Sequence, residues 1–199
     1  MYLNKVMVNW RWARDPYQLH RALWQLFPDL PQAKREFLFR TEHQQPGTGA
    51  LLLLQSALPP VDAPVAHIIA SKPFEPVLNV QQSLRFRLRA NVVKTIKDAH
   101  GRLDRAGNPK RCRVPLIKEE EQLQWLQRKL NEAALIKQAC VMPEKPMFFE
   151  KAYMGGKIQP VSFEGVLTIT DPLRFIQILQ TGIGPAKALG CGLLSIAPL

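Results

Sequence analysis

Alternation of apolar and polar positions predicts several strands in this chain. The strictest case is residues 83–91, SLRFRLRAN, where two leucines and a phenylalanine alternate with three arginines. Because successive side chains of a strand point to opposite faces, this pattern is typical of a strand buried on one side. Looser patterns predict strands at residues 2–9, 35–42, 50–57 and 157–170, with a turn rich in Gly and Pro at residues 46–49. The strand at residues 83–91 would therefore carry a cationic outer face.

Helical periodicity marks further segments. After Asp15, apolar residues recur at positions 19, 22, 23, 26 and 27, which is the spacing of one helix face. Asp15 suits the N-cap, Pro16 suits the first helical position, Gln18 suits a capping-box-like contact, and Pro28 would end the helix. Residues 116–133 predict a second amphipathic helix. Residues 171–182 predict a third that again begins with Asp-Pro and ends at a glycine, and a short helix is expected at residues 65–69.

The order of these elements predicts an α+β fold. In both halves a strand runs into a helix that begins with Asp-Pro, and the first half continues with strand, strand, short helix and strand. This order fits two units of the split βαβ type. A length of 199 residues leaves room for two small domains, and we expect them at residues 1–80 and 81–199.

Positive charge is concentrated in one part of the chain. The formal net charge is +11, and residues 85–118 hold eleven basic and two acidic residues, so this segment carries +9. The imbalance favours a polyanionic partner, with a membrane surface as the weaker alternative. Residues 98–115 are expected to form a basic loop or hairpin, and alternate arginines on the preceding strand would face successive phosphates. The basic residues of this segment that we expect to bind RNA are Arg85, Arg87, Arg89, Lys94, Arg102, Arg105, Lys110, Arg111 and Arg113.

Several other classes of protein have little support. The longest apolar stretch, at residues 50–61, is far shorter than the ~20 residues of a membrane span, and the first residues do not resemble a signal peptide, so a cytoplasmic location is expected. Three cysteines without a C-x-x-C pair argue against disulfides and structural zinc, and we expect them to be reduced and mostly buried. The four histidines lack the spacing of a zinc hydrolase, so we expect neither a metal nor a small-molecule cofactor.

The pattern also narrows the type of nucleic-acid recognition. No helix-turn-helix pattern supports a DNA-binding regulator. The basic strand offers only Phe86, on its apolar side, for stacking on single-stranded bases. Recognition of a structured RNA backbone is therefore the favoured interpretation.

Tyr17 and His20 are the candidate catalytic residues. They lie one turn apart beside the buried stripe of the first helix and near its N-terminal amides, where a helix favours a phosphate. An imidazole can protonate a leaving oxygen or accept a proton from a 2′-hydroxyl, and a phenol can stabilise a strained phosphate. From the pattern alone, a packing role at a domain edge is the simpler interpretation of this pair.

A glycine-rich segment follows the third helix. Gly182 and Gly184 allow close approach of the backbone to another backbone or to a phosphate, and Lys187 lies between this pair and two later glycines. Helix capping and a tight turn account for part of this pattern, and RNA contact would account for the rest.

Several longer stretches carry a resemblance to a known family. They are MYLNKV, YQLH, LRFRLRANVVKTIKD, GRLDRAGNPKRCRVPLIKEEEQLQWLQRKL, FEGVLTI and GIGPAKALGCGLL, and they span nearly the whole chain. In these stretches the chain resembles the CasE family of CRISPR-associated endoribonucleases, the subunit of type I-E Cascade that processes precursor crRNA.

The resemblance implies two tandem ferredoxin-like domains of the RRM type, with the order βαββαβ. It implies metal-independent cleavage at the 3′ base of a CRISPR repeat hairpin by 2′-hydroxyl attack, which leaves a cyclic phosphate and a 5′-hydroxyl. The family's catalytic histidine and its accompanying tyrosine fall on His20 and Tyr17, and Lys157 would enter a groove of the RNA stem. The mature crRNA would stay bound, with other Cascade subunits as partners. The alternative function is a scaffold that binds hairpin RNA without cutting it.

Overall fold

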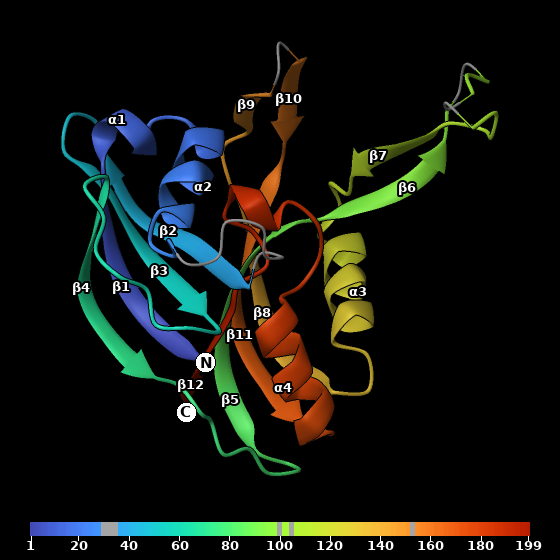
Figure 1. The fold of residues 1–199 in the computed structure, drawn as a ribbon. Coiled ribbons are helices and arrows are strands. Elements are labelled where there is room, and N and C mark those ends of the chain that lie inside the picture. The colour runs from blue at the N-terminus through green and yellow to red at the C-terminus, as the bar shows by residue number, and fades with distance from the viewer. Residues whose placement is uncertain (29–35, 99–100, 104–105, 152–153) are drawn as a thin grey trace.

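The computed structural model describes residues 1–28, 36–98, 101–103, 106–151 and 154–199. Two four-stranded antiparallel sheets, each with its own helices and its own hydrophobic core, lie side by side (Figure 1). Both sheets have the strand order of a ferredoxin-like fold, so the predicted α+β architecture is confirmed.

The first sheet has the order β2-β3-β1-β4. Its strands are β1 (Tyr2–Asn9), β2 (Phe37–Gln45), β3 (Gly49–Ser56) and β4 (Ala66–Pro73). The helices α1 (Trp10–Ala13) and α2 (Pro16–Trp24) cover one face and bury Leu19 and Leu23 against β1, β2 and β3. The chain crosses from β3 to β4 through residues 57–65, which contain no helix.

The short helix predicted at residues 65–69 is wrong, because this segment begins β4. Ile68 pairs with Val6 of β1, and the pairing continues to Pro73 opposite Tyr2. The edge of β1 pairs with seven of the eight residues of β4, whereas a single helical turn would leave most of its backbone groups unpaired. Local periodicity carries no information on that pairing.

The second sheet has the order β12-β5-β11-β8. Its strands are β5 (Ser83–Asn91), β8 (Ala134–Pro143), β11 (Pro160–Ile169) and β12 (Leu194–Pro198), with the helices α3 (Glu119–Leu130) and α4 (Pro172–Thr181). The alternation of β5 is confirmed, because Leu84, Phe86 and Leu88 are buried. The strands β8 and β12 have no counterpart in the predicted set, and the single strand predicted at residues 157–170 is divided at Gln159.

Two hairpins extend from this second unit (Figure 1). One consists of β6 (Val93–Lys97) and β7 (Arg111–Pro115), between β5 and α3, which confirms a hairpin in the basic segment. The other consists of β9 (Met147–Lys151) and β10 (Met154–Ile158), between β8 and β11. The second hairpin approaches α2 of the first unit.

The two units meet along β2 and β3. The buried Arg40 of β2 donates to the carbonyl oxygen of Arg87 at 3.2 Å and to Ser195 Oγ at 2.9 Å, and Gln55 of β3 donates to the carbonyl oxygen of Leu179 at 2.6 Å. The last strand of the first sheet ends at Pro73 and the first strand of the second begins at Ser83. The domain division at residues 80 and 81 stays a prediction.

Candidate functional site

The start of α2 is determined by its cap. Asp15 Oδ1 accepts a hydrogen bond from the amide of Gln18 at 2.8 Å, Pro16 occupies the first helical position, and Leu19 donates to the carbonyl oxygen of Asp15. The predicted helix start is therefore confirmed. The Asp15 carboxylate therefore occupies one of the helix amides that were expected to bind a phosphate. The N-terminus of α2 is by itself a weaker anion site than the sequence predicts.

His20 lies in a cluster of aromatic rings. Its ring is 6.2 Å from that of Trp24, edge to face, and 5.7 Å from that of Phe37 on β2. Phe37 in turn contacts Trp24 at 5.3 Å and stacks on Phe27 at 5.4 Å. The residue is half-buried, and its Nε2 atom is buried. These rings hold the imidazole plane in one orientation.

No pattern in the sequence indicates this aromatic cluster. Phe37 follows His20 by 17 positions and belongs to another element, so no local pattern connects them. Tyr17 is half-buried at the first turn of α2, three residues before His20, and neighbours at this spacing share one helix face. The catalytic roles of Tyr17 and His20 stay predictions.

A cavity of about 370 Å³ lies beside the N-terminal end of α2. It is lined from the first unit by residues such as Arg14 and His43, and from the second by Arg89, Glu144 and Phe148. Cationic side chains from both units thus reach the region of the first turn of α2.

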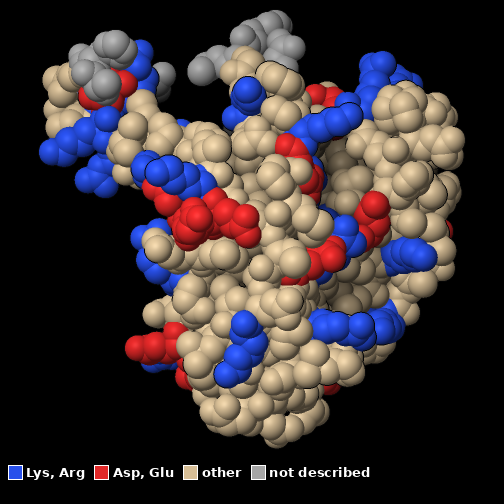
Figure 2. All heavy atoms as spheres, turned by 180° about the vertical axis from the view of Figure 1, so that it is seen from behind, with Lys and Arg blue, Asp and Glu red and all other residues tan. Residues whose placement is uncertain are grey.

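The three arginines of β5 make contacts within the protein. Arg85 donates to the carbonyl oxygen of Pro198 at 2.9 Å. Arg87 lies between Glu42 of β2 at 3.1 Å and Glu164 of β11 at 2.9 Å, and Arg89 binds Glu144 at 2.7 Å. Two of the three guanidinium groups are therefore paired with carboxylates, and oppositely charged side chains alternate in the hollow between the two units (Figure 2). Phosphate contact by these arginines stays a prediction and would compete with these ion pairs.

The hairpin of β6 and β7 presents a cationic face to solvent. Lys97 lies directly opposite Arg111, and Arg113 shares their face two positions along β7. Like charges at opposite positions destabilise a pair of strands, so an anion bound across them would relieve the repulsion. Basic side chains cover the projecting hairpin in Figure 2.

The other basic residues near this hairpin differ in their surroundings. Arg102 forms a bidentate pair with Asp98, at 3.0 and 2.7 Å, and its hydrogen bonds hold the pKa of the Asp98 carboxyl well below its usual range. Lys94 is 3.8 Å from Glu121, and Lys110 is exposed. Arg105 lies outside the described residues. The RNA contacts of these residues stay predictions.

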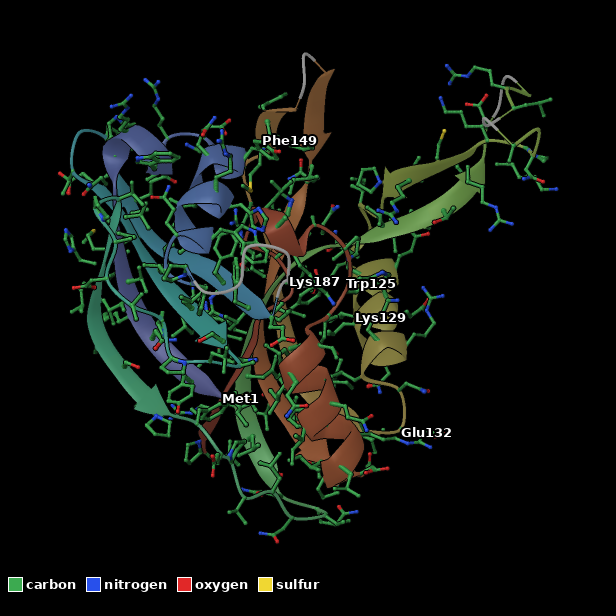
Figure 3. The ribbon with its side chains drawn as sticks, in the orientation of Figure 1. Met1, Trp125, Lys129, Glu132, Phe149 and Lys187 are labelled. Atoms are coloured by element: carbon green, nitrogen blue, oxygen red, sulfur yellow. The ribbon has the colours of Figure 1, made fainter. Side chains whose placement is uncertain are left out.

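The glycine-rich segment packs closely against the rest of the protein. A Cβ atom at Gly182 would lie 2.8 Å from the carbonyl oxygen of Gly192 and from Leu38, and one at Gly184 would lie 2.9 Å from Trp125. Lys187 donates from Nζ to the carbonyl oxygen of Thr181 at 2.6 Å. Figure 3 shows Lys187 in the segment after α4. These glycines thus have a packing function, and their RNA contacts stay predictions.

The hairpin of β9 and β10 carries an exposed aromatic residue beside a cation. Phe148 is 68% exposed, and Lys157 Nζ lies 5.5 Å from the centre of its ring. Phe149 occupies the space that a side chain at position 156 would need, which accounts for Gly156 in β10 (Figure 3). Entry of Lys157 into an RNA groove stays a prediction.

Three further expectations concern cysteines, metals and membranes. Cys191 is buried, but Cys112 is half-buried and Cys140 is exposed, so the expectation of mostly buried cysteines is wrong. Among the described residues, no three His, Cys, Asp or Glu side chains gather as a metal site would require. Within the same residues, no helix has the length and apolar character needed to cross a membrane.

Comparisons with known proteins match the chain over its full length. A family described as CRISPR associated protein matches residues 1–198. The CRISPR system Cascade subunit CasE of Escherichia coli is 54% identical over 199 residues, which is all of both chains. A crystal structure of Cas6e from the same species has a TM-score of 0.88 at 53% identity, again covering both chains completely.

A second relative is more distant and has been solved with RNA. The CRISPR-associated endoribonuclease Cse3 of Thermus thermophilus is 33% identical over an alignment of 222 positions, which covers all of both chains. Its structure bound to an RNA representing a pre-cleavage complex has a TM-score of 0.77 at 34% identity and covers 99% of this chain and 98% of that one.

Proposed function

The chain belongs to the family of CRISPR-associated proteins that includes CasE and Cse3, and on that basis we propose that it is an endoribonuclease that cleaves the repeat hairpins of CRISPR precursor RNA. The observation that carries the proposal is the full-length likeness to a named endoribonuclease whose structure holds a pre-cleavage RNA. The mature crRNA then stays bound, and the protein serves as a subunit of Cascade, as the name of its E. coli relative indicates.

The proposed reaction is an internal transesterification of the RNA. The 2′-oxygen of the nucleotide before the cut attacks the adjacent phosphorus, and the bond from phosphorus to the 5′-oxygen of the next nucleotide breaks. The 2′-hydroxyl gives its proton to solvent water and the departing 5′-oxygen gains one from a protonated group of the protein, so the products are a cyclic phosphate and a 5′-hydroxyl end. The bonds to phosphorus that form and break involve only atoms of the RNA, and the proposal invokes neither a metal nor a cofactor.

His20 is the proposed proton carrier, with Tyr17 beside it. The imidazole is assigned to the protonation of the 5′-oxygen, and the Tyr17 hydroxyl is assigned to orienting the phosphate or stabilising its charge. The cluster of Trp24 and Phe37 supports this assignment because it holds the ring in a defined plane. Since Nε2 is buried, proton transfer to the RNA proceeds through Nδ1 or requires Nε2 to become exposed.

The RNA stem is proposed to lie against basic side chains of the second unit. The cationic face of the β6–β7 hairpin, with Lys97, Arg111 and Arg113, offers phosphate contacts that compete with few carboxylates. Removing one such contact should flatten the dependence of log K on log salt by about one unit of slope. An unchanged slope for all of these residues would place the stem elsewhere.

The catalytic assignment is tested by single-turnover cleavage of a repeat hairpin in EDTA. His20→Ala should slow cleavage by about 10²- to 10⁴-fold while the hairpin still binds, because general acid or base catalysis typically contributes that factor. His67→Ala is the matched control, since His67 is exposed on β4 and lies 4.0 Å from Asp62. If His20→Ala bound the hairpin poorly but cleaved the fraction that it did bind at the normal rate, His20 would not be the proton carrier.

A second substrate separates the nuclease from the scaffold. A hairpin with a single 2′-deoxy nucleotide before the cut lacks the attacking oxygen, so it should bind normally and remain whole. A protein that shifts both hairpins equally on a gel and yields no product from either would be a scaffold.

A further inference from the structure

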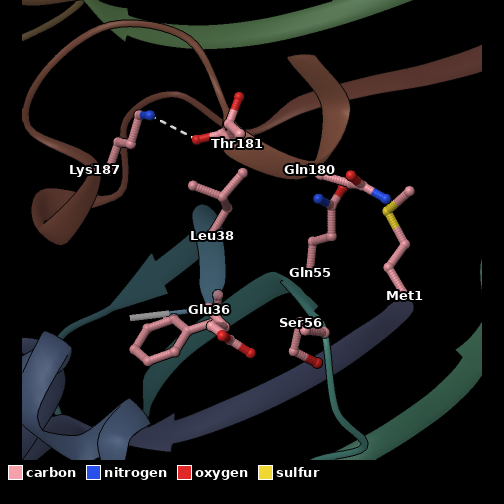
Figure 4. A pocket seen from close by; sticks show the side chains of 10 residues that line it. Met1, Glu36, Leu38, Gln55, Ser56, Gln180, Thr181 and Lys187 are labelled. Carbon is pink, nitrogen blue, oxygen red and sulfur yellow. Dashed lines mark hydrogen bonds between the residues drawn. The ribbon is translucent and has the colours of Figure 1, made fainter. Parts of the chain in front are cut away.

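A cavity of about 590 Å³ lies between the two units. One wall comes from the start of β2 and the end of β3, and the other from the end of α4 and the glycine-rich segment. Figure 4 shows the two walls facing each other, with Leu38 and Gln55 on one side and Thr181 and Lys187 on the other. A cavity of this size at a domain interface is in the usual range for a small ligand.

The walls of the cavity are held in place by one hydrogen bond across the interface and one within the second unit. The buried Gln55 donates to the carbonyl oxygen of Leu179 at 2.6 Å, which joins β3 to α4. Lys187 Nζ donates to the carbonyl oxygen of Thr181 at 2.6 Å, which keeps an ammonium group at the rim. The cavity therefore has a defined shape before any ligand enters.

The lining includes Glu36, whose carboxylate can accept hydrogen bonds from a base, and its other residues match the chemistry of a nucleotide. Leu38 and Met1 offer apolar surface to the face of a base. The amide side chain of Gln180 can both donate to and accept from a base edge. The ammonium group of Lys187 supplies a positive charge for a phosphate.

The cavity adjoins the proposed catalytic residue. Phe37 lines the cavity, and its ring lies 5.7 Å from that of His20. The proposed cut lies at the 3′ base of a hairpin, so the nucleotide before the scissile phosphate is the last one of the stem and the nucleotide after it is unpaired. A paired base brings its partner strand with it, whereas an unpaired base can enter a space enclosed between two walls.

We propose that this cavity binds the first unpaired nucleotide on the 3′ side of the scissile phosphate. The inference rests on the proposed function, and it assigns a binding site to the nucleotide that carries the leaving 5′-oxygen. Holding that nucleotide between β2 and the glycine-rich segment orients the 5′-oxygen relative to His20, and such orientation lowers the barrier of the chemical step. Recognition of the base should therefore affect cleavage more than overall binding of the hairpin.

The test combines an RNA that lacks the base with a protein variant whose cavity is filled. An RNA that is abasic at the first downstream nucleotide should be cleaved about 10- to 100-fold less efficiently than intact RNA, as expected when a contact that orients the leaving oxygen is lost. An RNA that is abasic three nucleotides further downstream is the control. In Gln180→Trp, whose new ring would occupy the cavity, intact and abasic RNA should be cleaved equally slowly.

Leu173→Trp is the matched protein control. Leu173 lies on the same helix, is 76% exposed and does not line the cavity, so this variant should discriminate between the two RNAs as the original protein does. The inference would be overturned if Gln180→Trp still distinguished intact from abasic RNA as the original protein does. It would also be overturned if the original protein cleaved both RNAs equally. Neither result would affect the nuclease assignment.

A second readout does not depend on cleavage. In a 2′-deoxy hairpin that cannot be cut, 2-aminopurine at the first downstream position should change its fluorescence on binding, and Gln180→Trp should abolish that change. Absence of the change in the original protein would overturn the inference. Failure to cut the intact hairpin would instead refute the proposed function, and the fluorescence result would still decide whether the nucleotide enters the cavity.

Discussion

Gly182→Ala should destabilise the protein by more than the strain of its backbone angle. Gly182 has a φ of +72° and a ψ of 165°, a backbone conformation that is essentially restricted to glycine and costs another residue about 1 to 3 kcal/mol. Its Cβ atom would also lie 2.8 Å from the carbonyl oxygen of Gly192 and 2.8 and 2.9 Å from the two methyl carbons of Leu38. Real Cβ atoms essentially never approach that closely, so β2 or the glycine-rich segment must move.

The cost of that movement can be separated from the cost of the angle. Gly47→Ala is the control for a positive φ without crowding, because Gly47 has a φ of +79° and no atom within 4 Å of an added Cβ. Forcing an extra methyl group into a packed site typically costs about 1 to 3 kcal/mol. Gly182→Ala should therefore lower the free energy of unfolding by about 1 to 3 kcal/mol more than Gly47→Ala does.

Urea denaturation followed by circular dichroism measures both free energies, and a filter-binding titration with a repeat hairpin measures the affinity for RNA. Equal losses of stability in the two variants, within about 0.5 kcal/mol, would refute the packing argument. If Gly182→Ala then still weakened RNA binding, the close approach at this glycine would serve the RNA rather than β2.

Two further outcomes are expected elsewhere in the molecule. Arg40→Ala should lower the free energy of unfolding, measured by urea denaturation, by about 3 kcal/mol. The substitution removes two charge-assisted hydrogen bonds to the second unit, and each contributes about 1.5 kcal/mol. A loss below about 1 kcal/mol would contradict this account. Burial raises the pKa of the Cys191 thiol to about 12. Alkylation at pH 8 followed by mass spectrometry should therefore label the exposed Cys140 in the native protein and Cys191 only after unfolding. Rapid labelling of Cys191 in the native protein would show that the glycine-rich segment opens.

Several elements could be predicted because their signals are local. The start of α2 depends on Asp15, Pro16 and the amide of Gln18, which are within four residues of one another. The burial pattern of β5 follows from a strict alternation that any half-buried strand would show. Where the pairing partner decides the structure, as for β4 against β1, the local pattern indicated the wrong element.

The sequence by itself determined the candidate residues Tyr17 and His20, the concentration of charge around the β6–β7 hairpin, and the family resemblance. Only the tertiary structure decided that Phe37 packs on the His20 ring, that Arg87 and Arg89 face carboxylates, and that Gly182 packs on Leu38. The physical reason is that side-chain type and spacing along one element are properties of a short segment. The neighbours of a side chain across an interface depend on how two separately formed sheets dock, which brings together residues as far apart as Arg40 and Ser195.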